Sequence, residues 1–70
     1  MNTFGAHLRE LREAKGLNQR QLADVAGLNA ATISHLEQGI REVRMAHAIK
    51  LARVFDITVD ELIAPVREVA

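Results

Sequence analysis

The residues whose types could hold a metal ion or act in catalysis include three histidines, the single serine and Asp24. His7, His35 and His47 do not stand at a metal-ligand spacing such as i, i+4, and the chain has no cysteine. Ser34, His35 and Asp24 are the ingredients of a hydrolytic triad, but adjacent residues on one helix point in different directions. We therefore expect no metal, no cofactor, no small-molecule ligand and no enzymatic activity.

The composition predicts one small helical domain. The chain has 70 residues, of which 49% are hydrophobic, and its two aromatic residues are Phe4 and Phe55. A core of leucine, isoleucine, valine and alanine suits packed helices, and this length leaves no room for a second domain. We expect residues 1–70 to form a single all-α domain.

Charge and cysteine content bear on the compartment and the partner. The absence of cysteine favours a reducing compartment, with the cytoplasm as the default. No apolar run approaches the ~20 residues that a membrane span needs, and no signal pattern opens the chain, so we expect no membrane association. The formal net charge is zero, which is less basic than many nucleic-acid-binding domains.

Glycines and short polar residues divide the sequence into five segments of helix length, without the strict alternation of a half-buried strand. The first segment, about residues 3–15, is followed by Gly16 as a C-terminal stop. The second opens with a capping box of Asn18 and Gln21 and ends before Gly27.

Three further segments follow. The third begins at the N-cap candidate Asn29 and ends at Gly39. The fourth covers about residues 45–55, and its start is left open because no cap residue precedes it. Its helical spacing predicts that four residues face the core: Met45, Ala48, Ala52 and Phe55. The fifth opens with a capping box at Thr58, and Pro65 is expected to end or kink it.

The stretch from about residue 19 to residue 38 fits two short helices joined by a tight turn. Ala23 is small where the second helix of the pair must approach closely, and Gly27 stands where the turn needs a left-handed backbone. Five further residues are apolar where the pair must face the core: Leu22, Ala26, Leu28, Ile33 and Leu36. Together these matches predict a helix-turn-helix.

The sequence resembles the phage-repressor and Cro type of helix-turn-helix domain, the XRE family. The matching text is LRELREAKGLNQRQLADVAGLNAATISHLEQG over residues 8–39 and IKLARVFDITVDELI over residues 49–63. The resemblance implies a compact five-helix, lambda-repressor-like fold whose third helix lies in the major groove of DNA.

The same resemblance implies a set of DNA-facing residues. Phosphates would be met at the start of the second helix by Asn18 and Gln19, and base edges by the exposed residues Ala30, Ala31, Ser34 and His35. Asn29 and Thr32 would lie beside the DNA backbone, and the loop arginines Arg41 and Arg44 would hold it. Two alanines stand where family members often carry longer readers, so specificity should also rest on DNA shape.

Other charged and apolar residues have more than one reading. The resemblance implies a partly buried ion pair of Arg12 and Glu37 between the first and third helices. Lys15 and Arg20 are either solvated charges or phosphate contacts. The fifth helix and tail, residues 58–70, carry an apolar stripe that is either a frayed end or, as we favour, a dimer surface: Val59, Ile63, Val66 and Val69.

These features predict a transcriptional regulator, most simply a repressor, that binds a palindromic operator in double-stranded DNA as a homodimer. A phage repressor, a restriction-modification controller and the antitoxin partner of a toxin all fit the residues. An adaptor that keeps the fold but binds DNA weakly or not at all is the alternative, favoured by the zero net charge and the two alanines.

Overall fold

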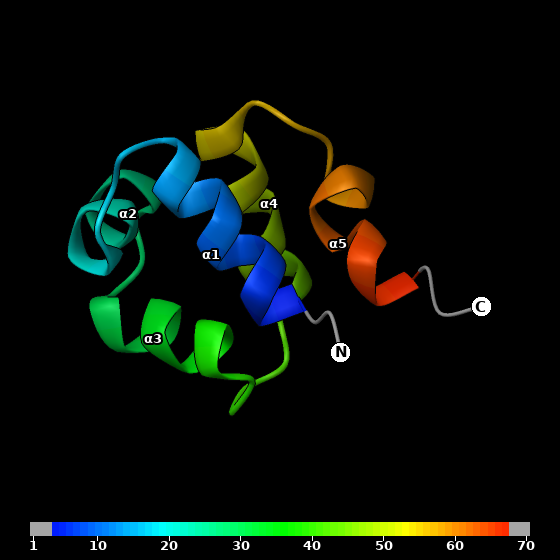
Figure 1. Cartoon of the computed structure of the whole chain (residues 1–70), viewed down its shortest axis with the longest axis horizontal. Coiled ribbons are helices and arrows are strands. Elements are labelled where there is room, and N and C mark those ends of the chain that lie inside the picture. The colour runs from blue at the N-terminus through cyan, green and yellow to red at the C-terminus, as the bar shows by residue number, and fades with distance from the viewer. Residues whose placement is uncertain (1–3, 68–70) are drawn as a thin grey trace.

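The computed structural model describes residues 4–67, with side chains over residues 4–63. This part of the chain holds five α-helices and no strand, and Figure 1 shows them gathered into one bundle. The helices are α1 (Phe4–Ala14), α2 (Gln19–Ala26), α3 (Ala30–Gln38), α4 (Met45–Phe55) and α5 (Val59–Arg67). None of these helices has the length and hydropathy needed to cross a membrane. The expected all-α, five-helix fold is confirmed.

Side-chain caps fix the starts of α2 and α3. The Asn18 carboxamide oxygen accepts from the Gln21 backbone N–H at 2.7 Å, and the Gln21 side chain accepts from the Asn18 N–H at 2.9 Å. The Asn29 carboxamide oxygen accepts from the Thr32 N–H at 2.8 Å. Such caps satisfy amide groups that a helix leaves unpaired in its first turn, so each sequence signal produced the expected boundary.

The two later helices differ from one another at their starts. Arg44 occupies the N-cap position of α4 without a side-chain cap hydrogen bond. At the start of α5, Thr58 and Glu61 form the expected capping box, with reciprocal bonds of 2.9 and 3.0 Å. Pro65 was expected to end or kink this helix; an end at Pro65 is wrong, because α5 continues to Arg67. Proline removes one amide donor, and the helical backbone on both sides continues in spite of that loss.

The centre of the bundle is an aliphatic core drawn from all five helices. Six large side chains are fully buried, at least one from each helix: Leu8, Leu22, Ile33, Leu36, Leu51 and Leu62. Burying such a side chain contributes about 1.5–3 kcal/mol relative to leaving it in water. The core therefore holds the α2–α3 pair against α1, α4 and α5.

Gly5 lets α1 approach the C-terminal end of α3. A Cβ atom at this position would lie only 2.6 Å from the Leu36 carbonyl oxygen and would also collide with the Glu37 carbonyl. Both obstructing groups are backbone atoms, so a side chain here would force the two helices apart. The close approach fixes the position of α3 relative to α1.

Candidate nucleic-acid interface

The helices α2 and α3 are joined by a three-residue turn. Gly27 ends α2 in the left-handed conformation, at φ 72°, and its N–H bonds to carbonyl oxygens of the preceding turn. The Leu28 N–H also turns back to the Ala23 carbonyl at 2.8 Å. These bonds reverse the chain within residues 27–29, and α3 leaves at the lower edge of the bundle in Figure 1. The arrangement is a helix-turn-helix.

A polar network fixes this unit to α1. The Arg12 guanidinium donates to both carboxylate oxygens of Glu37, at 2.7 and 3.1 Å, and to the Leu17 carbonyl at 2.9 Å. The Gln19 side-chain amide donates to the same carboxylate at 3.2 Å. Glu37 thus links α1, α2 and α3, and the ion pair expected from the sequence is present.

The network is shielded from solvent. The exposed fractions of the Arg12 and Glu37 side chains are 11% and 5%. The hydrogen bond that Arg12 donates to Glu37 raises the pKa of Arg12, burial opposes that rise, and the charge of Glu37 adds to it. The guanidinium therefore stays charged at neutral and moderately alkaline pH, and the two-pronged pair holds a defined geometry.

The N-terminal half of α3 presents the side chains expected to face bases. Ala30 and Ala31 are exposed, and Ser34 and His35 are half-buried. The Ser34 hydroxyl accepts a hydrogen bond from the Gln38 side-chain amide at 2.6 Å, which leaves its own hydrogen free to donate. The structure thus brings these four residues onto one helix.

Thr32 does not lie on the exposed face of α3. Its residue is only 6% exposed, and its hydroxyl donates to the Asn29 carboxamide oxygen at 2.9 Å. Because a side chain in the first turn of a helix points back toward the N-terminus, this hydroxyl completes the cap instead of reaching outward. Asn29 itself is exposed. The expected contact of Thr32 with the DNA backbone is therefore a poor fit to this geometry.

Two of the donors at the start of α2 are used within the protein. The Asn18 backbone N–H serves the capping box, and the Gln19 side-chain amide donates to Glu37. The backbone N–H groups of Gln19 and Arg20 lie in the first turn, where a helix offers no internal acceptor. An anion at this helix end would therefore be met by these backbone groups and by the Asn18 side-chain amide, whose oxygen alone serves the cap.

Two arginines in the loop between α3 and α4 carry exposed positive charge. Neither Arg41 nor Arg44 forms an ion pair within the described residues. Lys15 and Arg20 are exposed as well, so both of their readings stay open. The basic residues that flank the helix-turn-helix are therefore available to a negatively charged partner.

Two of the four residues expected on the dimer surface, Val59 and Ile63, have described side chains. Val59 and Ile63 are half-buried and pack against the core. The side chain of Val66 is outside the described side chains, and Val69 lies outside the described residues.

Exposed apolar surface lies elsewhere in the described part of the chain. Met45 is 63% exposed, although helical spacing placed it with the inward set of α4. Met45 is the first residue of α4 and directly follows Arg44, which forms no side-chain cap hydrogen bond. The other large exposed apolar residues are Val25, Ile40 and Ile49. Sequence reasoning missed them: Val25 and Ile49 adjoin the buried residues Ala26 and Ala48, and Ile40 lies in the exposed loop after α3.

Residues 8–62 match the helix-turn-helix family, and the chain belongs to that family, in its XRE type. The chain is 43% identical over 65 residues to the HTH-type transcriptional regulator RghRB of Bacillus subtilis. It is 46% identical to the restriction-modification controller protein C.AhdI of Aeromonas hydrophila, covering 84% of this chain and 89% of that one with a TM-score of 0.80.

A third comparison concerns the fold alone. The P22 c2 repressor, solved in complex with a synthetic operator, superposes with a TM-score of 0.83 at 21% identity, over 90% of this chain and 96% of that chain. The match to RghRB covers 91% of this chain but only 47% of the relative. The chain therefore spans about half the length of that regulator.

Proposed function

We propose that this protein is a sequence-specific regulator of transcription that binds double-stranded DNA through α2 and α3. The observation that carries the proposal is the fixed helix-turn-helix: Glu37 links three helices, while Ala30 and Ala31 of α3 are exposed and Ser34 and His35 are half-buried. The names of the related proteins, an HTH-type transcriptional regulator and a restriction-modification controller, support the same function.

In this mechanism α3 enters the major groove and its outer residues read base edges. Ser34 supplies a hydroxyl donor, and His35 an imidazole that donates or accepts. Ala30 and Ala31 contribute only methyl groups, which contact a thymine methyl but make no hydrogen bond. With so few polar readers, DNA shape and deformability supply a large part of the specificity.

Phosphate contacts position the helix without reading sequence. Backbone N–H groups at the start of α2 meet one strand, and the exposed side chains of Arg41 and Arg44 meet the backbone beyond α3. Gln19 stays bonded to Glu37 and so keeps the start of α2 in register with α3. The zero net charge is compatible with this function because Arg41 and Arg44, which form no ion pair within the described residues, lie in the loop that follows α3.

We propose further that the active form is a homodimer on a palindromic operator, with half-sites about 34–36 Å apart. Residues 58–70 remain part of the proposed surface. Because Val59 and Ile63 are half-buried, the exposed side chains of Met45 and Ile49 would add apolar area to that surface. These two residues are four positions apart and so share a face of α4.

Among the regulatory roles, the restriction-modification controller is favoured by one observation. The identity to C.AhdI is 46% over 84% of this chain, whereas the identity to the P22 c2 repressor is 21% over 90% of this chain. A role as the antitoxin partner of a toxin stays the second candidate. A gel shift on the protein's own promoter, together with the identity of the flanking genes, separates the two, because a controller gene adjoins a nuclease or methyltransferase gene.

The decisive test of DNA binding is a salt series by fluorescence anisotropy with sheared genomic DNA and the protein's own promoter. We expect affinity to fall steeply as salt rises, and promoter binding to exceed genomic binding at every salt concentration. Arg9→Ala, which breaks the exposed pair with Glu13, is the matched control and should leave the curve unchanged. Absence of binding at the lowest salt would favour the adaptor alternative.

A further inference from the structure

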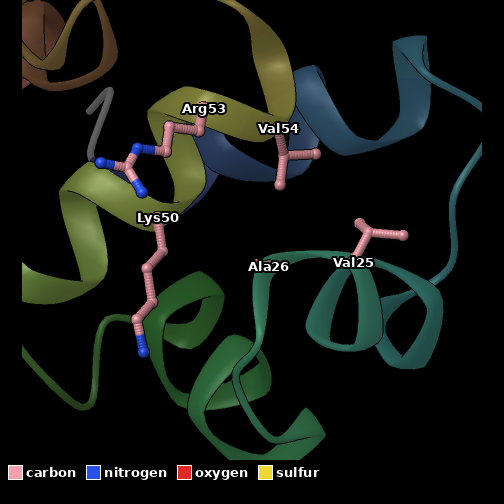
Figure 2. Close-up of a pocket in the computed structure, with 5 residues that line it drawn as sticks. All are labelled: Val25, Ala26, Lys50, Arg53 and Val54. Atoms are coloured by element: carbon pink, nitrogen blue, oxygen red, sulfur yellow. The ribbon is translucent and has the colours of Figure 1, made fainter.

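The described part of the chain has an open cleft between α2 and α4 that the DNA-binding proposal does not use. It has a volume of about 360 Å³ and is lined by Val25, Ala26, Lys50, Arg53 and Val54. Figure 2 shows Val25 of α2 and Val54 of α4 on opposite sides of the space, with both cationic side chains extending from α4. None of the five belongs to the proposed DNA-facing set.

The apolar part of the cleft is open to solvent at its α2 side. Val25 is 61% exposed, while the adjacent Ala26 is buried and Val54 is half-buried. An exposed valine facing a second valine across a hollow offers apolar area that a partner's side chain can cover. Such covering would remove apolar surface from water, which is the usual source of affinity at a small docking site.

The cationic part of the cleft is unneutralised. Lys50 and Arg53 are exposed, and neither forms an ion pair within the described residues. Because they are three positions apart on α4, their side chains lie on one face of the helix, about one turn from each other. They therefore offer two positive charges along the rim of a hollow whose interior is aliphatic.

We propose that this cleft is a docking site for a short acidic segment of a partner protein, in which two carboxylates flank a large apolar side chain. The carboxylates would meet Lys50 and Arg53, and the apolar side chain would cover Val25 and Val54. A phosphate backbone would satisfy only the cations and leave the aliphatic lining in water. Charge complementarity and apolar burial together select an acidic peptide, and this docking is independent of DNA binding.

The test is a two-dimensional NMR titration with a blocked peptide in which two glutamates, three positions apart, enclose phenylalanine and leucine. We expect shift changes centred on the amides of the five lining residues. The double variant Lys50→Glu/Arg53→Glu should weaken binding at least about tenfold, equivalent to roughly 1.4 kcal/mol. Val25→Ser, at an exposed position, should weaken it as well. Lys15→Glu, which reverses an exposed charge in the turn directly after α1, should leave peptide binding unchanged.

Several results would overturn the docking site. These are equal binding of a peptide carrying lysines in place of the glutamates, no response to the double variant, or shifts centred elsewhere. A loss of promoter binding in the double variant as large as that of Arg41→Ala would instead assign the cleft to the DNA interface. Failure of the wild-type protein to bind DNA would reject the proposed function and leave the peptide titration unaffected.

Discussion

Arg12 on α1 and Glu37 on α3 face each other as a two-pronged ion pair, with nitrogen–oxygen distances of 2.7 and 3.1 Å. The hydrogen bond that Arg12 donates to Glu37 raises the pKa of Arg12 above an ordinary value that already lies far above neutrality. Stabilisation from a raised pKa is complete below the ordinary value and is lost only as pH rises through the raised one. Between neutral and moderately alkaline pH, titration of Arg12 therefore leaves the pair intact.

Removing Arg12 should be costly because it leaves a buried carboxylate without its charge partner. We predict that Arg12→Ala lowers the free energy of unfolding by about 3 kcal/mol or more. Arg9→Ala on the same helix breaks an exposed pair with Glu13 and should cost about 0–1 kcal/mol. Urea unfolding of both variants measures the difference, and equal midpoints would show that burial does not strengthen the pair.

Gly5→Ala should destabilise the protein although alanine is the better helix former. The new Cβ would meet backbone oxygen atoms of α3, and overpacking of this kind costs about 1–3 kcal/mol. The control is Ala14→Gly, an exposed change at the last residue of the same helix, which should cost at most the ~0.5–1 kcal/mol of a glycine in a helix interior. A thermal melt in which Gly5→Ala is more stable than wild type would mean that α1 and α3 can separate without loss.

Arg44→Ser should move stability and DNA affinity in opposite directions. Serine would give α4 the N-cap that it lacks, worth about 1 kcal/mol, while removing a proposed phosphate contact. Arg41→Ser is the matched control, because it removes a loop arginine without providing a cap. Thermal melts and promoter titrations on both variants decide the case. If the Arg44→Ser protein has the melting temperature of the wild type, the serine does not act as a cap. If it binds the promoter with wild-type affinity, Arg44 does not contact a phosphate.

Arg41 and His35 should fail in different ways if one positions the protein and the other reads bases. Arg41→Ala should weaken binding to every sequence by a similar factor and reduce the salt slope by about one contact per subunit. His35→Ala should relax preference at one position in each half-site, at about 1–3 kcal/mol, with little change in salt slope. Binding to a selected site and its single-base variants across salt concentrations separates the two patterns. If instead His35→Ala weakened binding to all sequences equally, or Arg41→Ala changed which bases are preferred, the placement of α3 in the groove would be wrong.

Met45→Glu should dissociate the dimer while leaving the protomer folded, because Met45 is exposed and contributes little to the core. Val25→Glu adds the same charge at an equally exposed valine outside the proposed dimer surface and should leave the dimer intact. Ile63→Glu, by contrast, should lower stability as well, since Ile63 is half-buried. Sedimentation at high micromolar concentration reports the association state. A monomeric wild-type protein under those conditions rejects the homodimer.

Local signals explain which parts of the fold could be predicted from the sequence. The caps at Asn18, Asn29 and Thr58 act within one helical turn, so residue identity alone located three helix starts. The role of Gly5 could not be predicted, because its close neighbours lie more than thirty residues away in the chain. At Pro65 a local signal was misleading: proline often ends a helix, but α5 continues past it to Arg67.

The candidate site divides in the same way. The helix-turn-helix register and the Arg12–Glu37 pair follow from a family pattern with fixed spacing. The burial of Thr32 does not, because a threonine in the first turn of a helix can face either the cap or the solvent. The cleft beside Lys50 is set by the crossing of α2 and α4, and no spacing within one segment encodes that crossing.

The six fully buried aliphatic side chains come from every helix, and this distribution has a consequence for how the protein comes apart. No pair of helices keeps a complete core when the other helices unfold, so the helix-turn-helix of α2 and α3 should not stay folded on its own. Heating or denaturant should abolish the signals of α1 and α5 together, in a single transition with matching calorimetric and van't Hoff enthalpies. A process that unfolds α1 or α5 would therefore also unfold the helix-turn-helix.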